Sequence, residues 1–185
     1  MSTRPATNRE IPGECRLREQ VLPSDREHVR RIVESTGFFR ADEVDVAVEL
    51  VDERLAKGPA SGYEFVLADR GDRAVGYACF GPIACTIGSY DLYWIAVDAE
   101  QQGTGLGRLL LNAAEDAIRC AGGRHVYIET SNRPQYTPTR GFYDRCGYRL
   151  AAVLPDFYAP GDGKVIYVKD LTSIAQPDAA GDPTA

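Results

Sequence analysis

A stretch of the chain, DAEQQGTGLGRLLL, places three glycines at alternate positions, Gly103, Gly105 and Gly107. Glycine at this density marks backbone that turns tightly or comes close to another group. Behind it, residues 106–121 repeat apolar side chains at the spacing of one helix face. The first turn of a helix offers unpaired N–H groups and a partial positive charge. The stretch therefore predicts a phosphate-binding loop at a helix N-terminus.

Four glycine motifs compete for this loop. A P-loop needs a Lys followed by Ser or Thr, and a dinucleotide fingerprint needs glycine where Arg108 stands, so both fail. A methyltransferase-like GxGxG fits the glycines, and Glu129 ends a following strand where a ribose acceptor would be. The preceding strand, however, ends well before Gly103, a long gap for a tight strand-to-helix turn. The fourth pattern, Q/R-x-x-G-x-G/A, matches Gln102, Gly105 and Gly107.

Side chains able to move protons occur in three other segments. Asp91 is the one carboxylate of the strand-like SYDLYWIAV, Glu129 ends the strand-like HVYIETS, and Tyr143 lies in FYDRCGY. The two histidines, His28 and His125, are expected to be structural or exposed. Asp91 and Glu129 can each also be read as surface carboxylates.

On the loop and on FYDRCGY, the sequence resembles the GNAT superfamily of acyl-CoA-dependent N-acetyltransferases over about residues 16–171. In that family the loop wraps the pyrophosphate of coenzyme A, and the preceding strand pairs with the pantetheine arm. The resemblance implies that acetyl-CoA is the donor, that a primary amine is the acceptor and that no metal takes part. The residues it implies for coenzyme A are Ile95, Ala96, Val97, Gln102, Gly103, Thr104, Gly105, Leu106, Gly107, Arg108, Ser131 and Tyr143.

The resemblance also implies catalytic roles. Tyr143 stands where a family tyrosine protonates the departing thiolate, although a phenol with a pKa of about 10 is a weaker acid than a thiol at about 8.5. Asp91 lies near the place where several members hold a general base, and Glu129 is the second candidate. An amine acceptor needs such a base because only about one molecule in 10³ is deprotonated at pH 7. The family's usual Asn, seven residues before the tyrosine, is replaced by Tyr136, so its role either falls to Ser131 or Asn132 or is absent.

The acceptor site is expected around aromatic and acidic side chains. The stretch LPDFYAPGDG bunches such groups in what the sequence predicts to be a loop between the last two strands. Such groups bind a cationic amine through charge and cation–π contacts. The predicted acceptor residues are Tyr93, Tyr136, Asp156, Phe157 and Tyr158.

These segments require a scaffold that is α/β in class. The pattern of elements predicts a mixed sheet, and the resemblance implies a largely antiparallel one of about seven strands, with splayed central strands and about four helices. Residues 15–171 are expected to form one domain, with a flexible arm at 1–14 and a disordered tail at 172–185.

The composition of the chain argues against some classes of binding partner. A net charge of −6 argues against nucleic acid as a ligand, and no apolar run is long enough for a membrane span. Five scattered cysteines without a CxxC pair fit reduced thiols, so a cytoplasmic location is expected. A homodimer is expected from the resemblance alone.

The preferred interpretation is an acetyltransferase that acts on a small-molecule amine. Two alternatives stay open, a non-catalytic acyl-CoA-binding or sensing module and a methyltransferase that uses S-adenosylmethionine.

Overall fold

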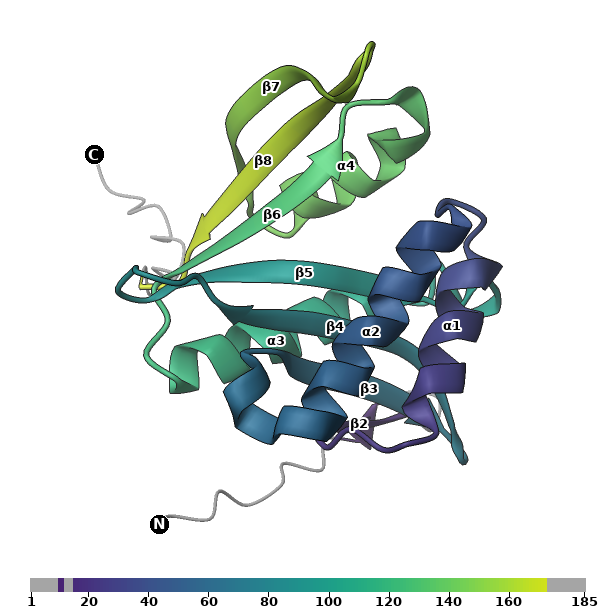
Figure 1. Cartoon of the computed structure of the whole chain (residues 1–185). Helices are drawn as coiled ribbons and strands as arrows, with labels where there is room; N and C mark the ends of the chain where they lie inside the picture. Colours follow the sequence, from purple (N-terminus) through teal and green to yellow (C-terminus); the bar gives the residue numbers. More distant parts are fainter. Residues whose placement is uncertain (1–9, 12–14, 173–185) are drawn as a thin grey trace, which may run out of the picture.

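The structure is a computed structural model that describes residues 10–11 and 15–172 (Figure 1). Within these residues one eight-stranded sheet runs in the order β1-β2-β3-β4-β5-β6-β8-β7. The strands are β1 (Glu10–Ile11), β2 (Cys15–Arg18), β3 (Glu64–Arg70), β4 (Arg73–Pro82), β5 (Ser89–Val97), β6 (His125–Ser131), β7 (Arg149–Ala159) and β8 (Asp162–Asp170). Neighbours pair antiparallel except β5 and β6, which are parallel. The predicted mixed, largely antiparallel sheet is confirmed.

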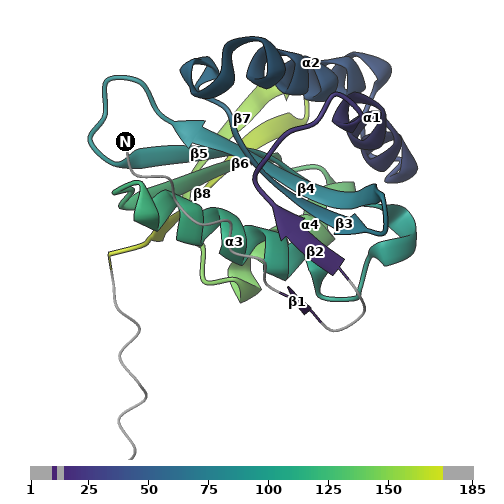
Figure 2. The same ribbon diagram turned by 90° about the horizontal axis from the view of Figure 1, so that it is seen from below.

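Helices cover both faces of this sheet (Figures 1 and 2). They are α1 (Asp25–Ser35), α2 (Ala41–Lys57), α3 (Leu106–Cys120) and α4 (Thr137–Arg145), with short 3₁₀ turns at Gly58–Ser61, Ala99–Gln101 and Pro134–Tyr136. Side chains of α1 and α2 form one core with β3 and β4, and those of α3 form a second core on the other face. The apolar stripe of α3 buries Leu106, Leu110 and Ile118, as its spacing predicts.

The central strands splay apart as expected. β5 pairs with β6 only from Ser89 to Leu92, opposite residues 125–128. Beyond that point β6, β8 and β7 lean away from β5, and the gap is open in Figure 1. The β4–β5 register also shifts, because Phe80 pairs with Leu92 while Cys79 pairs with Trp94. Tyr93 is therefore the extra residue of a β-bulge where the splay begins.

The bulge changes which side chains of β5 share a face. Strict alternation would group Asp91 with Ile95, but Ile95 packs on the α3 core together with Leu92. Trp94 and Ala96 pack on the α1–α2 core instead. A bulge shifts the side-chain alternation by one residue, which is the physical reason for the difference.

Two further expectations need correction. Glu10 and Ile11, inside the predicted arm, form β1, while 1–9, 12–14 and 173–185 lie outside the described residues. The predicted loop LPDFYAPGDG is largely strand, since β7 continues to Ala159 with a register shift after Leu154.

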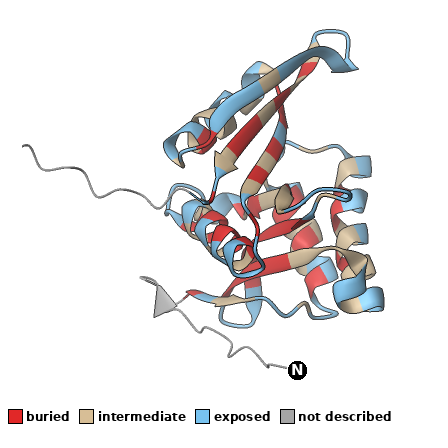
Figure 3. Ribbon diagram, turned by 90° about the vertical axis from the view of Figure 1, so that its left-hand side faces the viewer, coloured by how far each residue is buried: buried red, intermediate tan, exposed pale blue. Residues whose placement is uncertain are grey.

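Burial follows the layers, as Figure 3 shows. Inner strands and helix faces are buried, whereas nearly every residue of the edge strand β7 is exposed. Among the described residues, no helix has the length and apolar character needed to span a bilayer.

Candidate active site

A cleft of about 660 Å³ lies at the splay between β5 and β6. Its walls come from the α1–α2 loop, the ends of β5 and β6, the loop before α3, and α4. Predicted residues that line it are Tyr93, Ile95, Ala96, Val97, Gln102, Gly103, Gly107, Glu129, Ser131, Tyr136, Tyr143 and Tyr158. Predicted residues outside its lining are Asp91, Thr104, Gly105, Leu106, Arg108, Asp156 and Phe157. Most of the predicted set thus gathers around one cavity.

The glycine loop leaves the first turn of α3 open. Gly103 and Gly105 have φ of 76° and 88°, which favour glycine, and no heavy atom lies within 4 Å of a Cβ built at either position. Gly105 is the N-cap and provides no side chain to cap the helix. The first helical bond runs from Leu109 N–H to the Gly105 carbonyl, at 3.1 Å. The N–H groups of residues 106–108 precede that bond and are available to a ligand.

Side chains of the loop brace it from within. Thr104 Oγ1 donates to the carbonyl of Gln101 at 2.7 Å, and the Asp98 carboxylate accepts from Glu100 N–H at 3.2 Å. Gln102 Nε2 lies 3.5 Å from the carbonyl of Val97. Arg108 points elsewhere, since its guanidinium donates to the carbonyl of Arg145 at 2.7 Å and thereby joins α3 to α4.

Beside the loop, β5 presents a free backbone edge. Residues 95–97 pair with β4 along one edge, but the β5–β6 pairing has ended at Leu92. Their second edge therefore faces the cleft, where an extended ligand can pair with it as an added strand. The free edge and the start of α3 adjoin the same cavity.

Tyr143 stands in the cleft wall on α4 and is only 5% exposed. Its ring packs against those of Phe142, Tyr148 and Tyr167, with centroids 5.4–5.9 Å away. Burial is the main cause that raises the pKa of its hydroxyl well above the ordinary value, so the phenol stays protonated.

Two carboxylates lie near the vertex of the splay. Asp91 is half-buried, opposite Gly81 of β4 and Tyr127 of β6. Burial, and after it the charge of Glu129, raise the pKa of Asp91, while Lys164 acts against them. Glu129 lines the cleft and forms an ion pair with Lys164, with Nζ and Oε2 2.5 Å apart. Burial and the nearby Asp91 raise the pKa of Tyr93 to about 12.

The end of β6 holds the residues expected to replace the family asparagine. Ser131 Oγ donates to Asp162 at 2.5 Å and accepts from Arg133 N–H at 3.0 Å. Asn132 Oδ1 accepts from Gly163 N–H at 2.9 Å. Both side chains therefore fasten β6 to the start of β8.

The predicted acceptor residues of β7 make different contacts, although the Phe157 and Tyr158 rings touch each other with centroids 5.0 Å apart. The Asp156 carboxylate accepts from Gly161 N–H at 2.7 Å and so shapes the hairpin turn. Phe157 lies under the ammonium of Lys164, which is 3.8 Å from its ring centroid. Tyr158 faces the cleft, where burial raises the pKa of its hydroxyl to about 12.

Sequence reasoning missed one wall of the cleft, the α1–α2 loop. Phe38 contacts the Tyr136 ring with centroids 5.9 Å apart, and Phe39 contacts Trp94 at 5.1 Å. Further unpredicted lining residues are Thr36, Arg40, Glu43, Thr130, Arg133, Pro138, Thr139, Phe142 and Asp162. Two phenylalanines directly after the helix-ending Gly37 were the available signal, because exposed aromatic residues in a loop often serve binding.

In the part of the chain that the structure describes, no three His, Cys, Asp or Glu side chains group as metal ligands.

Known proteins resemble this chain in sequence and in fold. A family model described as "Acetyltransferase (GNAT) domain" matches residues 61–150. A solved structure assigned to the GNAT acetyltransferase family, from Desulfovibrio desulfuricans, is 52% identical. It covers 85% of this chain and 99% of its own, with a TM-score of 0.84.

Two other similarities are partial or more distant. Blasticidin-S acetyltransferase of Streptomyces morookaense is 42% identical over 85 residues, which are 44% of this chain and 55% of that enzyme. The chain spans less than two thirds of each curated relative that it matches. A solved aminoglycoside 6'-N-acetyltransferase complexed with coenzyme A is 20% identical, covers 88% of this chain and 99% of its own, and has a TM-score of 0.69, which speaks for the fold alone.

Proposed function

Because the chain belongs to the GNAT family of acetyltransferases, we propose that it transfers an acetyl group from acetyl-CoA directly to a primary amine. The observation that carries this proposal is the open first turn of α3, beside the free edge of β5. Acetyl-CoA would supply the activated acetyl thioester. The molecule's own residues bind it, orient it and move protons.

Binding of the pyrophosphate falls to backbone donors. The N–H groups of Leu106, Gly107 and Arg108 precede the first helical bond, and each bond to a charged oxygen contributes about 1.5–3 kcal/mol. Several such bonds outweigh the weak repulsion from a net charge of −6. Residues 95–97 offer backbone partners for the amides of the pantetheine arm. The cradle fits the group in both charge and shape.

Tyr143 is the proposed proton donor to the departing thiolate. Its hydroxyl stays protonated because burial raises the pKa, and three neighbouring rings pack against its own ring and hold it in place. Position rather than acidity suits it to the task, since transfer concerted with bond breaking does not require a strong acid.

Asp91 is the proposed general base, acting through a water molecule because it does not line the cleft. Its raised pKa increases its basicity at neutral pH. Glu129 stays the second candidate; it lines the cleft, and its carboxylate forms an ion pair with Lys164.

A small-molecule acceptor is favoured over a protein. The curated relative with the higher identity is named for acetylation of blasticidin S, a small molecule. A cytoplasmic location and a homodimer stay predictions, the first from the scattered cysteines and the second from the family resemblance.

The test begins with thermal unfolding of the full chain with acetyl-CoA or S-adenosylmethionine. Ligand at 100 times its Kd should stabilise the fold by about 2.7 kcal/mol, and we expect this for acetyl-CoA only. Release of free thiol on adding amines then establishes turnover. Stabilisation by S-adenosylmethionine alone would overturn the proposal in favour of a methyltransferase. Stabilisation by acetyl-CoA without thiol release from any amine would favour the non-catalytic module.

A further inference from the structure

Each carboxylate that lines the cleft already has a cation of this chain beside it. Glu129 pairs with Lys164, and Arg133 Nε lies 3.2 Å from an Asp162 oxygen. Glu43 accepts from the backbone N–H of Arg40 at 2.8 Å, with the Arg40 guanidinium 3.9 Å away. Glu129 and Asp162 thus each have a cation of this chain as a partner, while the Arg40 guanidinium beside Glu43 also bonds to Asp42 at 3.0 Å.

Lys164 matters most among these cations because its side chain is only 13% exposed. Its ammonium lies 2.5 Å from Glu129, 3.8 Å from the Phe157 centroid and 5.8 Å from the Tyr158 centroid. Glu129 and Tyr158 line the cleft and are the groups that would otherwise hold a second ammonium of a substrate, whereas Lys164 and Phe157 lie outside the lining. Lys164 takes that place with a charge of its own.

The rest of the acceptor side is aromatic. Phe38 and Tyr136 meet across the cleft, and Phe39 stacks near Trp94. These rings come from both sides of the splay, from the α1–α2 loop and β5 on one side and the turn before α4 on the other. Because the Phe38 and Tyr136 rings already touch, a flat apolar body would pack on the aromatic surface that these rings and their neighbours present to the cleft.

Resting on the proposed function, we infer that the acceptor is a primary amine with one positive charge on a flat apolar body, such as an arylalkylamine. Polyamines and aminoglycosides carry several ammonium groups, and the cleft leaves no unpaired carboxylate among its described lining residues for the second one. Lys164 is the residue that sets this preference, by repelling a second ammonium and occupying its partners.

The experiment compares four amines by thiol release and by calorimetric binding in the presence of coenzyme A. Putrescine and n-butylamine share a four-carbon chain and differ in charge, while 2-phenylethylamine adds a ring and kanamycin adds charges. For the wild type we expect kcat/KM to be about 10-fold higher for 2-phenylethylamine than for n-butylamine. We expect n-butylamine to exceed putrescine by about 5-fold or more, with Kd values in the same order.

Lys164→Met then tests the residue itself. It frees Glu129 and the Tyr158 ring, which both line the cleft, so putrescine should gain about 10-fold in kcat/KM relative to n-butylamine. Lys57→Met is the matched control, since Lys57 pairs with Glu53 at the same 2.5 Å but on α2 outside the cleft lining. Its amine ratios should equal those of the wild type.

The outcomes distinguish a failure of the inferred amine class from a failure of the proposed acetyltransferase function. Preference of the wild type for putrescine or kanamycin overturns the inference and leaves the acetyltransferase standing. If a folded Lys164→Met variant keeps the wild-type ratio of putrescine to n-butylamine activity, the role assigned to Lys164 is overturned. The inferred class is also overturned if acetyl-CoA binds but none of the four amines either binds or is acetylated. Failure of acetyl-CoA to bind overturns the proposed function itself. The wild-type comparison does not depend on whether the variant folds.

Discussion

At the scale of single residues, the chemistry depends on side chains whose surroundings change their proton affinity. Tyr143 is buried among rings, and Asp91 is half-buried near another carboxylate. Burial disfavours the charged form of each, so both pKa values rise. The phenol is thereby kept as a proton donor, while the carboxylate becomes a better base. Perturbed groups at a cleft are typical of functional sites.

Tyr143→Phe should lower kcat about 100-fold, because general acid catalysis typically contributes 10²–10⁴-fold. Stabilisation by acetyl-CoA should stay unchanged, since the ring and its packing remain. Tyr167→Phe is the matched control; it removes a hydroxyl from a neighbouring buried ring that does not line the cleft. Stopped-flow or steady-state thiol release measures both. Equal kcat in the Tyr143 variant and the wild type across pH would remove the tyrosine from the acid role.

Asp91→Asn should remove the acidic limb of the pH–rate profile. A base works only when deprotonated, so kcat/KM of the wild type should fall as pH drops through the raised pKa, above the ordinary 3.8. Glu129→Gln should keep that limb. A limb that persists in the Asp91 variant and disappears in the Glu129 variant would exchange their roles.

The same variant makes a stability prediction of definite sign. The folded state binds the Asp91 proton more tightly than the unfolded chain, so stability is lost as pH rises through the folded pKa. Asp91→Asn does not undergo that loss. Its melting temperature should therefore match the wild type at pH 3 and exceed it at pH 7; an excess at pH 3 only would contradict the pKa assignment.

At the scale of elements, the start of α3 distinguishes two glycines of the loop. Gly105 has φ of 88°, where an L side chain costs roughly 1–2 kcal/mol. Gly107 is helical, and a Cβ there would meet Phe142 at 3.7 Å, which is ordinary contact. Urea unfolding should thus show Gly105→Ala destabilised by about that amount and Gly107→Ala as stable as the wild type or up to about 1 kcal/mol more stable. Equal losses in both variants would mean that space rather than backbone conformation requires these glycines.

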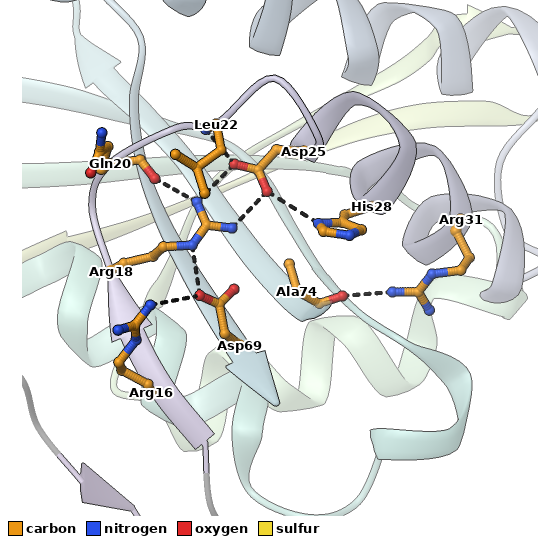
Figure 4. A network of polar contacts seen from close by, with 9 residues as sticks. All are labelled: Arg16, Arg18, Gln20, Leu22, Asp25, His28, Arg31, Asp69 and Ala74. Atoms are coloured by element: carbon orange, nitrogen blue, oxygen red, sulfur yellow. Dashed lines mark hydrogen bonds and ion pairs between the residues drawn. The ribbon is translucent and has the colours of Figure 1, made fainter. Parts of the chain in front are cut away.

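A buried ion cluster fastens β2 to α1 and β3, as Figure 4 shows. The Arg18 guanidinium bonds to Asp25 at 2.6 and 2.7 Å and to Asp69 at 2.7 Å, and Asp25 is fully buried. Arg18, foremost among the partners of Asp25, holds the pKa of that carboxyl below its ordinary value against the effect of burial. The cluster fixes the helix that leads into the α1–α2 wall of the cleft.

Asp25→Asn should destabilise the fold by about 3 kcal/mol at pH 7, because it leaves a buried guanidinium with one charged partner. The pH dependence is opposite to that of Asp91. A carboxyl with a lowered folded pKa contributes stability above 3.8, and this is lost as pH falls through the folded value. Denaturation from pH 7 to 2 should therefore show the gap to the wild type closing. A constant gap would assign the loss to packing instead of charge.

Periodicity in the sequence predicted most helices and strands, but it did not predict features that depend on how these elements contact one another. The α3 stripe and the glycine loop follow from local spacing, which the structure preserves, whereas Tyr143 was predicted from the family resemblance. The bulge at Tyr93 depends on how β4 and β5 pair, and no local pattern of SYDLYWIAV requires it. The position of Phe38 in the cleft depends on its contact with Tyr136, which is almost a hundred residues away in the chain. Lys164 carries no local signal in the sequence, because Phe157 and Glu129 come to lie beside it only when β7 and β6 pair with β8.

At the scale of the whole molecule, one continuous core holds the two sides of the splay. The α3 core contains Leu110 from one side, Ile128 and Tyr167 from the other, and Leu92 at the vertex. Because close-packed interiors deform little, the sides should keep their relative orientation when a ligand binds. The cleft is therefore expected to be preformed rather than closed by a hinge.

A preformed cleft makes a prediction for hydrogen exchange. Acetyl-CoA should slow amide exchange at residues 93–97 and 103–108, where backbone groups lack partners on the cleft side. Exchange in β3 should stay unchanged, since that strand is paired on both edges far from the splay. Small-angle scattering should show the same radius of gyration with and without ligand. Protection that spreads over the whole sheet, together with a smaller radius, would mean that the two sides close on the ligand, and the core below the vertex would then have to repack.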